Sequence, residues 1–70
     1  MKIQLLDLQD SSLLEVHNLK SDELAVALQC KFITFDKNTY SIHRSDMIVP
    51  KYSPITDSTP YVDIYVSLLR

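Results

Sequence analysis

The sequence predicts a small α+β to mainly β domain, built as an antiparallel curved sheet or open barrel of about five strands with one short α-helix. Apolar and polar residues alternate over much of the chain, which is typical of strands with one buried face. The segment 22–29 instead places Ala and Leu at helical spacing. Asn, Asp, Ser and Pro separate these segments and form the turns.

The N-terminal residues predict a β-hairpin. Residues 2–8 form its first strand, with Ile3 and Leu5 on one face, and Asp10-Ser11-Ser12 is a turn signal. In the second strand, Leu14 and Val16 alternate with Glu15 and His17. A short helix is the alternative for this second segment.

Ser21 marks the expected start of the helix. A serine hydroxyl can accept a hydrogen bond from a free amide, and Asp22 and Glu23 suit the positive end of the helix dipole. Leu24, Ala27 and Leu28 would form the buried stripe. Two turns are unstable in water alone, so packing must hold this helix.

The segment 31–44 predicts a second hairpin, with strands KFITF and YSIHR. Because the chain has no glycine, we expect Asn38 at positive φ in the turn. Cys30, between helix and hairpin, is expected to be a small buried residue.

The last third of the chain contains a loop and a clear final strand. Residues 46–49 end at Pro50 and predict a brief or edge strand, and the proline-rich 50–60 is a loop. From residue 61 onward Val62, Ile64, Val66 and Leu68 alternate with Tyr61, Asp63, Tyr65 and Ser67, so the aliphatic set should face the core. We expect residues 1–70 to form a single domain.

Composition excludes most catalytic and cofactor sites. The absence of glycine excludes glycine-rich phosphate loops. A single cysteine allows neither an internal disulfide nor a thiolate zinc cluster, and two histidines do not make a metal site. Neither a cysteine nor a serine nucleophile has a recognisable context. We therefore predict a protein that is not an enzyme and binds no cofactor or metal.

Charge and length limit the setting and the partners. The net charge is −2 and no segment is strongly basic, so direct nucleic-acid binding is not expected. No apolar run is long enough for a membrane helix, and Asp7 interrupts the start too early for a secretory signal, which favours the cytoplasm. A domain of this size without disulfides gains from self-association, so we expect a homodimer.

Two sets of residues are candidate contact surfaces. The candidate interface consists of Tyr52, Tyr61, Asp63 and Tyr65. Tyrosine supplies apolar area with a polar tip, which suits interfaces, although this face could instead be a second core layer under the helix or the N-terminal hairpin. The candidate acidic patch consists of Asp7, Asp10, Glu15, Asp22 and Glu23.

The segments KFITFDKNTYSIHRSDMIV and VDIYVSLL resemble a layout of small uncharacterised bacterial and phage proteins. The resemblance covers about half of the chain and is one of pattern; the turn that normally holds glycine has Asn38 here. It implies a compact open barrel that binds and modulates a host protein, and it carries over no functional residues.

These observations lead to one preferred function and two alternatives. The preferred function is a non-catalytic protein-binding modulator, a phage or mobile-element product that inhibits a host factor. The first alternative is an acidic DNA mimic or nucleic-acid-binding protein, and mimicry would use the acidic patch. The second alternative is a structural or assembly subunit.

Overall fold

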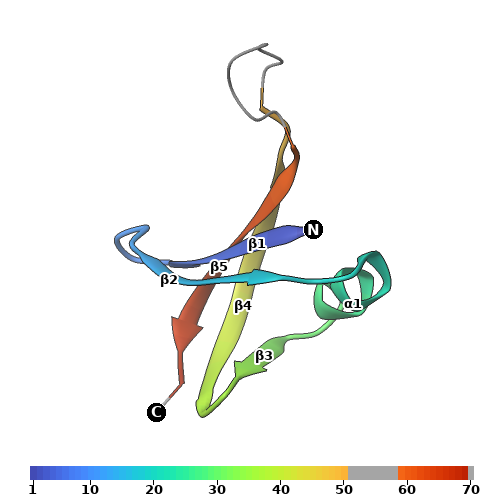
Figure 1. Ribbon diagram of the computed structural model, residues 1–70. Helices are drawn as coiled ribbons and strands as arrows, with labels where there is room; N and C mark the ends of the chain where they lie inside the picture. The colour runs from blue at the N-terminus through green and yellow to red at the C-terminus, as the bar shows by residue number, and fades with distance from the viewer. Residues whose placement is uncertain (51–58, 70) are drawn as a thin grey trace.

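The computed structural model describes residues 1–50 and 59–69, and in this part of the chain five strands form one sheet with one helix against it (Figure 1). The elements are β1 (Lys2–Asp7), β2 (Leu13–Asn18), α1 (Ser21–Ala27), β3 (Phe32–Phe35), β4 (Asn38–Ile48) and β5 (Tyr61–Leu68). The predicted small, curved, mainly β fold with one short helix is confirmed.

The strand order is β2-β1-β5-β4-β3, and the sheet is mixed. Neighbouring strands pair antiparallel except for β1 and β5, which are parallel, with Ile3 beside Val62 and Leu5 beside Ile64. An antiparallel sheet was therefore the wrong prediction in this one pairing. The parallel pair places the first and last strands side by side at the centre of the sheet, with the N-terminus and the C-terminal end of β5 apart from each other (Figure 1).

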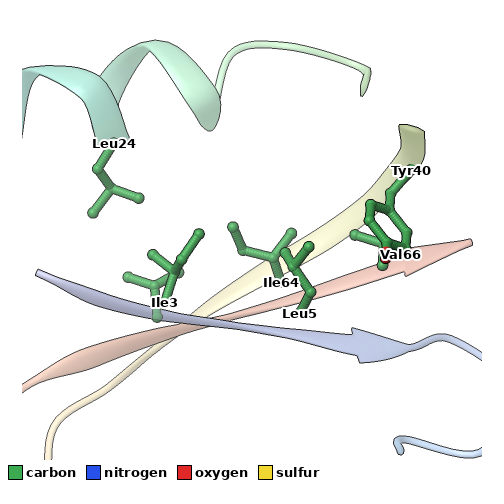
Figure 2. Close-up of a cluster of buried hydrophobic side chains, with 7 residues drawn as sticks. Ile3, Leu5, Leu24, Tyr40, Ile64 and Val66 are labelled. Atoms are coloured by element: carbon green, nitrogen blue, oxygen red, sulfur yellow. The ribbon is translucent and has the colours of Figure 1, made fainter. Parts of the chain in front are cut away.

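One face of the sheet carries the hydrophobic core. Five aliphatic side chains of β1 and β5 are almost completely buried, namely Ile3, Leu5, Val62, Ile64 and Val66. Tyr40 of β4 and Leu24 of α1 complete the cluster, and Figure 2 shows Leu24 pointing from the helix toward Ile3. Full burial of such a side chain contributes roughly 1.5–3 kcal/mol, so this face holds the fold together.

The sheet curls around this core until its two outermost strands touch. The ring of His17 on β2 stacks on the ring of Phe35 on β3, with 3.8 Å between the ring centroids and 7° between the planes. We call the core-bearing side the inner face and the opposite side the outer face.

The second strand turns its polar residues inward. Glu15 and His17 are half-buried, whereas Leu14 and Val16 are 38% and 46% exposed. The reason is the register with β1, in which His17 lies opposite Ile3 and Glu15 opposite Leu5, because directly opposite residues point to the same face. The strand prediction held, and the helical alternative for this segment did not.

The helix begins differently from the sequence prediction. Its N-cap is Lys20, not Ser21, and the Glu23 carboxylate accepts a hydrogen bond of 2.9 Å from the Lys20 amide. Leu24 is buried and Ala27 half-buried, as expected, but Leu28 is 40% exposed because the helix ends at Ala27. The helix is therefore attached to the sheet mainly through Leu24.

The second hairpin has a tighter turn than expected. Phe35 pairs with Asn38, so the loop has only two residues, and Asp36 has the positive φ of 54° while Asn38 begins β4. Positive φ at the first loop position is the requirement of a type II′ turn, which aspartate tolerates better than most residues.

Two further sequence predictions concern this region. Residues 46–48 are not a separate brief strand but the end of the long β4, which has a bulge between Ile42 and Arg44; the predicted edge position is correct, because beyond Ser41 β4 pairs only with β5 in the described part of the chain. Cys30 is exposed, not buried, and its thiol donates a hydrogen bond to the Val26 carbonyl at 3.3 Å.

In the described ranges no helix is long and apolar enough to cross a membrane.

Candidate interaction surface

The outer face of the central strand β5 displays Tyr61, Asp63 and Tyr65. These residues alternate with the buried aliphatic residues of the same strand, and all three are half-buried. Since α1 contributes Leu24 to the core of the inner face, the helix does not cover them. Within residues 1–50 and 59–69, no helix or strand packs on this outer face, so the tyrosine strip is not a second core layer beneath α1 or the N-terminal hairpin.

Each tyrosine ring is paired with a cation from a neighbouring strand. The Lys2 Nζ atom lies 5.5 Å from the centroid of the Tyr61 ring, and the Arg44 guanidinium carbon lies 4.2 Å from that of Tyr65. Such cation–π contacts contribute about 0.5–1 kcal/mol at exposed sites. They place a cation over each tyrosine ring within the single chain.

The carboxylate of Asp63 lies at the centre of the strip. Its cross-strand neighbour on β4 is Asp46 and its neighbour on β1 is Gln4. Burial raises the pKa of Asp63, the negative charge of Asp46 raises it further, and the charge of Lys2 partly opposes both. The Oδ1 atom is buried and has no hydrogen-bond partner among the described residues.

Asp46 has a partial partner of its own. The Arg44 guanidinium lies 3.6 Å from the Asp46 carboxylate, and both side chains are about half exposed. An exposed pair of this kind is worth at most about 1 kcal/mol. Among residues 1–50 and 59–69, the face therefore carries four charges, from Lys2, Arg44, Asp46 and Asp63, which sum to zero.

An apolar margin continues the face across β1 and β2. Leu6 of β1 lies beside Tyr65 and opposite Leu13 of β2. Leu13, Leu14 and Val16 are all exposed although they are large and hydrophobic. At the other end, a groove of about 610 Å³ adjoins Tyr61 and Lys2. We define the outer patch as Lys2, Gln4, Leu6, Leu13, Val16, Arg44, Asp46, Tyr61, Asp63 and Tyr65.

A second polar cluster lies on the inner face, where the curled edges meet. The His17 Nε2 atom and the Glu15 Oε1 atom are 2.9 Å apart. The Tyr40 hydroxyl has the largest effect on Glu15 and lowers its pKa, while the carboxylate raises the pKa of Tyr40. Glu15 Oε2 has no hydrogen bond of good geometry in the described structure, so the tyrosine acts on it through a longer or poorly directed contact.

This inner cluster serves to join strands. One His17 nitrogen is occupied by Glu15 and its ring by Phe35, and these residues line neither the groove beside Tyr61 nor the one beside Asp7. The sequence marked Glu15 only as an acid and His17 only as an unsupported imidazole. Nothing in the local sequence indicated that the polar side chains of β2, and not Leu14 and Val16, would point to the inner face.

The candidate acidic patch is not brought together. Asp7 and Asp10 lie at the β1–β2 turn, Asp22 and Glu23 lie at the start of α1 beyond the other end of that hairpin, and Glu15 faces inward (Figure 1). The four surface carboxylates accept hydrogen bonds from nearby backbone amides: Asp7 from Gln9, Asp10 from Ser12, Asp22 from Glu23, and Glu23 from Lys20. Their role in this structure is to stabilise turns and the helix start.

The other candidate residues form no chemical site. Tyr52 lies outside the described residues, and Cys30 and His43 are exposed. Over the described ranges, no three His, Cys, Asp or Glu side chains are grouped so that they could hold a metal ion. Comparisons of the chain with protein-family models, curated proteins and solved structures found no match.

Proposed function

We propose that this chain is a non-catalytic protein-binding module and that the outer patch is its contact surface. The observation that carries the proposal is the Tyr61–Asp63–Tyr65 strip, which Lys2 and Arg44 contact and which the described helix and strands leave open. Tyrosine and arginine are the side chains most often found at the energetic centres of protein interfaces.

The balance of charges favours a protein partner over a nucleic acid. Binding to a phosphate backbone needs clustered cations, whereas the outer patch carries two cations and two anions. Mimicry of DNA would need the acidic residues on one face, and they lie at opposite ends of the first hairpin. Both nucleic-acid alternatives therefore have less support than a protein partner. Inhibition of a host factor and a phage or mobile-element origin stay predictions from the resemblance.

The test is affinity capture from a bacterial lysate with matched variants. Tyr61→Ser combined with Tyr65→Ser removes the aromatic strip and should abolish capture of proteins that the wild-type chain retains. Val26→Ala is the control, because Val26 is 64% exposed on α1 and away from the patch. Equal capture by the double variant and the control, or no specific capture by the wild-type chain, would refute the proposal.

A further inference from the structure

The outer patch has the charge pattern of a surface that fits a copy of itself. In a two-fold interface, the same patch occurs on both sides, so it must contain both members of every polar pair. The outer patch holds two cations and two anions within the central strands. A surface built for a strongly acidic or strongly basic partner would carry an excess of one sign.

The unpartnered carboxylate and the nearest arginine are suitably placed for such a pairing. Arg44 lies opposite Tyr65, and Asp46 lies opposite Asp63, so Arg44 and Asp63 are diagonal neighbours across two paired strands. Diagonal neighbours are about 7–8 Å apart. Consider two copies packed face to face, with a two-fold axis that lies parallel to the sheets and halfway between them. If the axis passes above the midpoint between Arg44 and Asp63, at right angles to the line that joins them, Arg44 of each copy lies over Asp63 of the other.

The side chains have the reach and the freedom for this contact. Packed sheets lie about 10 Å apart, a gap that an arginine side chain spans. Arg44 is 61% exposed, and to reach a second copy its side chain leaves the Tyr65 ring, 4.2 Å away, and its long contact of 3.6 Å with Asp46. Asp63 Oδ1 is shielded within the chain, so a guanidinium from a second copy would pair with Oδ2 of the same carboxylate and compensate its charge.

The area of the face is in the range of a reversible dimer. Because the sheet curls away from this face, two copies meet over the central strands β1, β5 and β4. Three strands spaced about 4.8 Å apart, with six to eight residues rising about 3.3 Å each, give a contact of roughly 300–400 Å² per copy. A standard interface buries about 800 Å² per partner, and weak specific interfaces bury less than about 600 Å². The exposed Leu13, Leu14 and Val16 make the margin of this face apolar.

We infer that the outer patch binds a second copy of this chain, face to face, with Arg44 of each copy paired to Asp63 of the other. This inference rests on the proposed function, because it assigns an occupant to the same surface. At its margin the dimer would also shield Leu13 and Val16, the two large exposed hydrophobic side chains that belong to the outer patch.

The reciprocal pairing permits a charge-swap test. Arg44→Glu alone and Asp63→Lys alone each place two like-charged pairs in the homodimer, so each variant should dimerise at least tenfold more weakly than wild type in sedimentation equilibrium. An equimolar mixture restores both pairs: the Asp63→Lys chain offers its Arg44 to the partner's Asp63, and the two introduced charges attract each other. We expect the mixture to form a dimer with one chain of each kind.

Folding of each variant is checked by circular dichroism and cooperative urea unfolding. If Asp63→Lys does not fold, the Arg44→Gln variant tests the pairing by itself. This substitution removes the charge of an exposed side chain without damage to the core, and it should also weaken dimerisation tenfold. A wild-type chain that stays monomeric over a wide concentration series, unchanged dimerisation of Arg44→Gln, or a mixture no better than folded single variants would overturn the inference. A monomeric wild-type chain with tyrosine-dependent capture would remove the second copy while leaving the proposed function intact.

Discussion

The imidazole ring of His17 lies parallel to the phenyl ring of Phe35, at 3.8 Å, and this contact joins the two outermost strands of the sheet. The strands β2 and β3 do not pair with each other through backbone hydrogen bonds in the described structure. The curl of the sheet is therefore held at its open side by side chains, and the core of the inner face is enclosed as a consequence.

The first prediction concerns this stacking contact. Phe35→Leu removes the ring and should lower the free energy of unfolding by about 1 kcal/mol beyond the lost apolar area, which is the usual worth of an aromatic pair. Phe32→Leu is the matched control in the same strand, because Phe32 is 54% exposed, and it should change stability by less than about 0.5 kcal/mol. Urea unfolding measures both, and equal effects of the two substitutions would contradict the bridging role of Phe35.

The second prediction concerns the attachment of the helix. Leu24 is the buried residue of α1, so Leu24→Ala should cost about 2–5 kcal/mol, the usual range for a core leucine. A short helix has little stability of its own, so the far-ultraviolet circular dichroism signal of the helix should weaken at the same time. Val26→Ala, at a position 64% exposed in the same helix, should leave both signals unchanged. Retention of full stability by Leu24→Ala would show that other contacts hold the helix.

The third prediction concerns Tyr40 and the pH dependence of stability. Glu15 has a lowered pKa in the folded chain, so its contribution to stability is present above its unfolded pKa and is lost as the pH falls through the folded pKa. Tyr40→Phe removes the largest cause of this shift, so the pKa of Glu15 should rise and the loss of stability in acid should become shallower. At neutral pH the cost should be smaller than the roughly 0.5–1.5 kcal/mol typical of a well-formed hydrogen bond, because Glu15 Oε2 has no hydrogen bond of good geometry in the described structure.

The alkaline side gives an internal check of the same pair. Tyr40 has a raised pKa, so its contribution is present below its unfolded pKa near 10 and is lost as the pH rises through the folded value. Urea unfolding of wild type and Tyr40→Phe, measured over the acid and the alkaline pH range, gives both effects. Parallel stability curves for the two proteins would exclude the coupling between Tyr40 and Glu15.

Local patterns in the sequence predicted those elements whose faces differ clearly in polarity. β5 is the best example, because Val62, Ile64 and Val66 alternate strictly with polar or aromatic residues and each is buried. β2 shows the limit of this reasoning: Leu14 and Val16 are the hydrophobic set, yet the pairing with β1 turns them outward. The register of an edge strand depends on its partner, which a local pattern does not contain.

The candidate surface was predictable in part for the same reason. The alternation in β5 placed Tyr61, Asp63 and Tyr65 on one face, away from the core. The cations that contact the two tyrosines, Lys2 and Arg44, come from strands far away in the sequence, and the parallel pairing of β1 with β5 has no local signature. The acidic residues of the first half suggested a patch, but the separation of their elements in space disperses them.

The last prediction concerns Asp63, whose carboxylate is costly to the isolated chain. It lies opposite Asp46, and like charges directly opposite each other destabilise a sheet by roughly 0.2–1 kcal/mol. Asp63→Asn should therefore raise the stability of the dilute, monomeric chain at neutral pH by about this amount. Asp46→Asn is the control: it relieves the repulsion but leaves the buried carboxylate, so its gain should be smaller.

The pH dependence gives the sign of the effect at Asp63 and separates it from a general packing change. The pKa of Asp63 is raised in the folded chain, so the folded chain holds the proton more tightly, and stability falls as the pH rises from the unfolded value near 3.8 through the folded value. The stability difference between Asp63→Asn and wild type should thus grow over this interval and then level off. If the pairing with a second copy is correct, the same substitution should weaken dimerisation while it stabilises the monomer. A residue that lowers the stability of its own chain and strengthens association is then retained for binding, whereas a loss of monomer stability in Asp63→Asn would show that the carboxylate supports the fold itself.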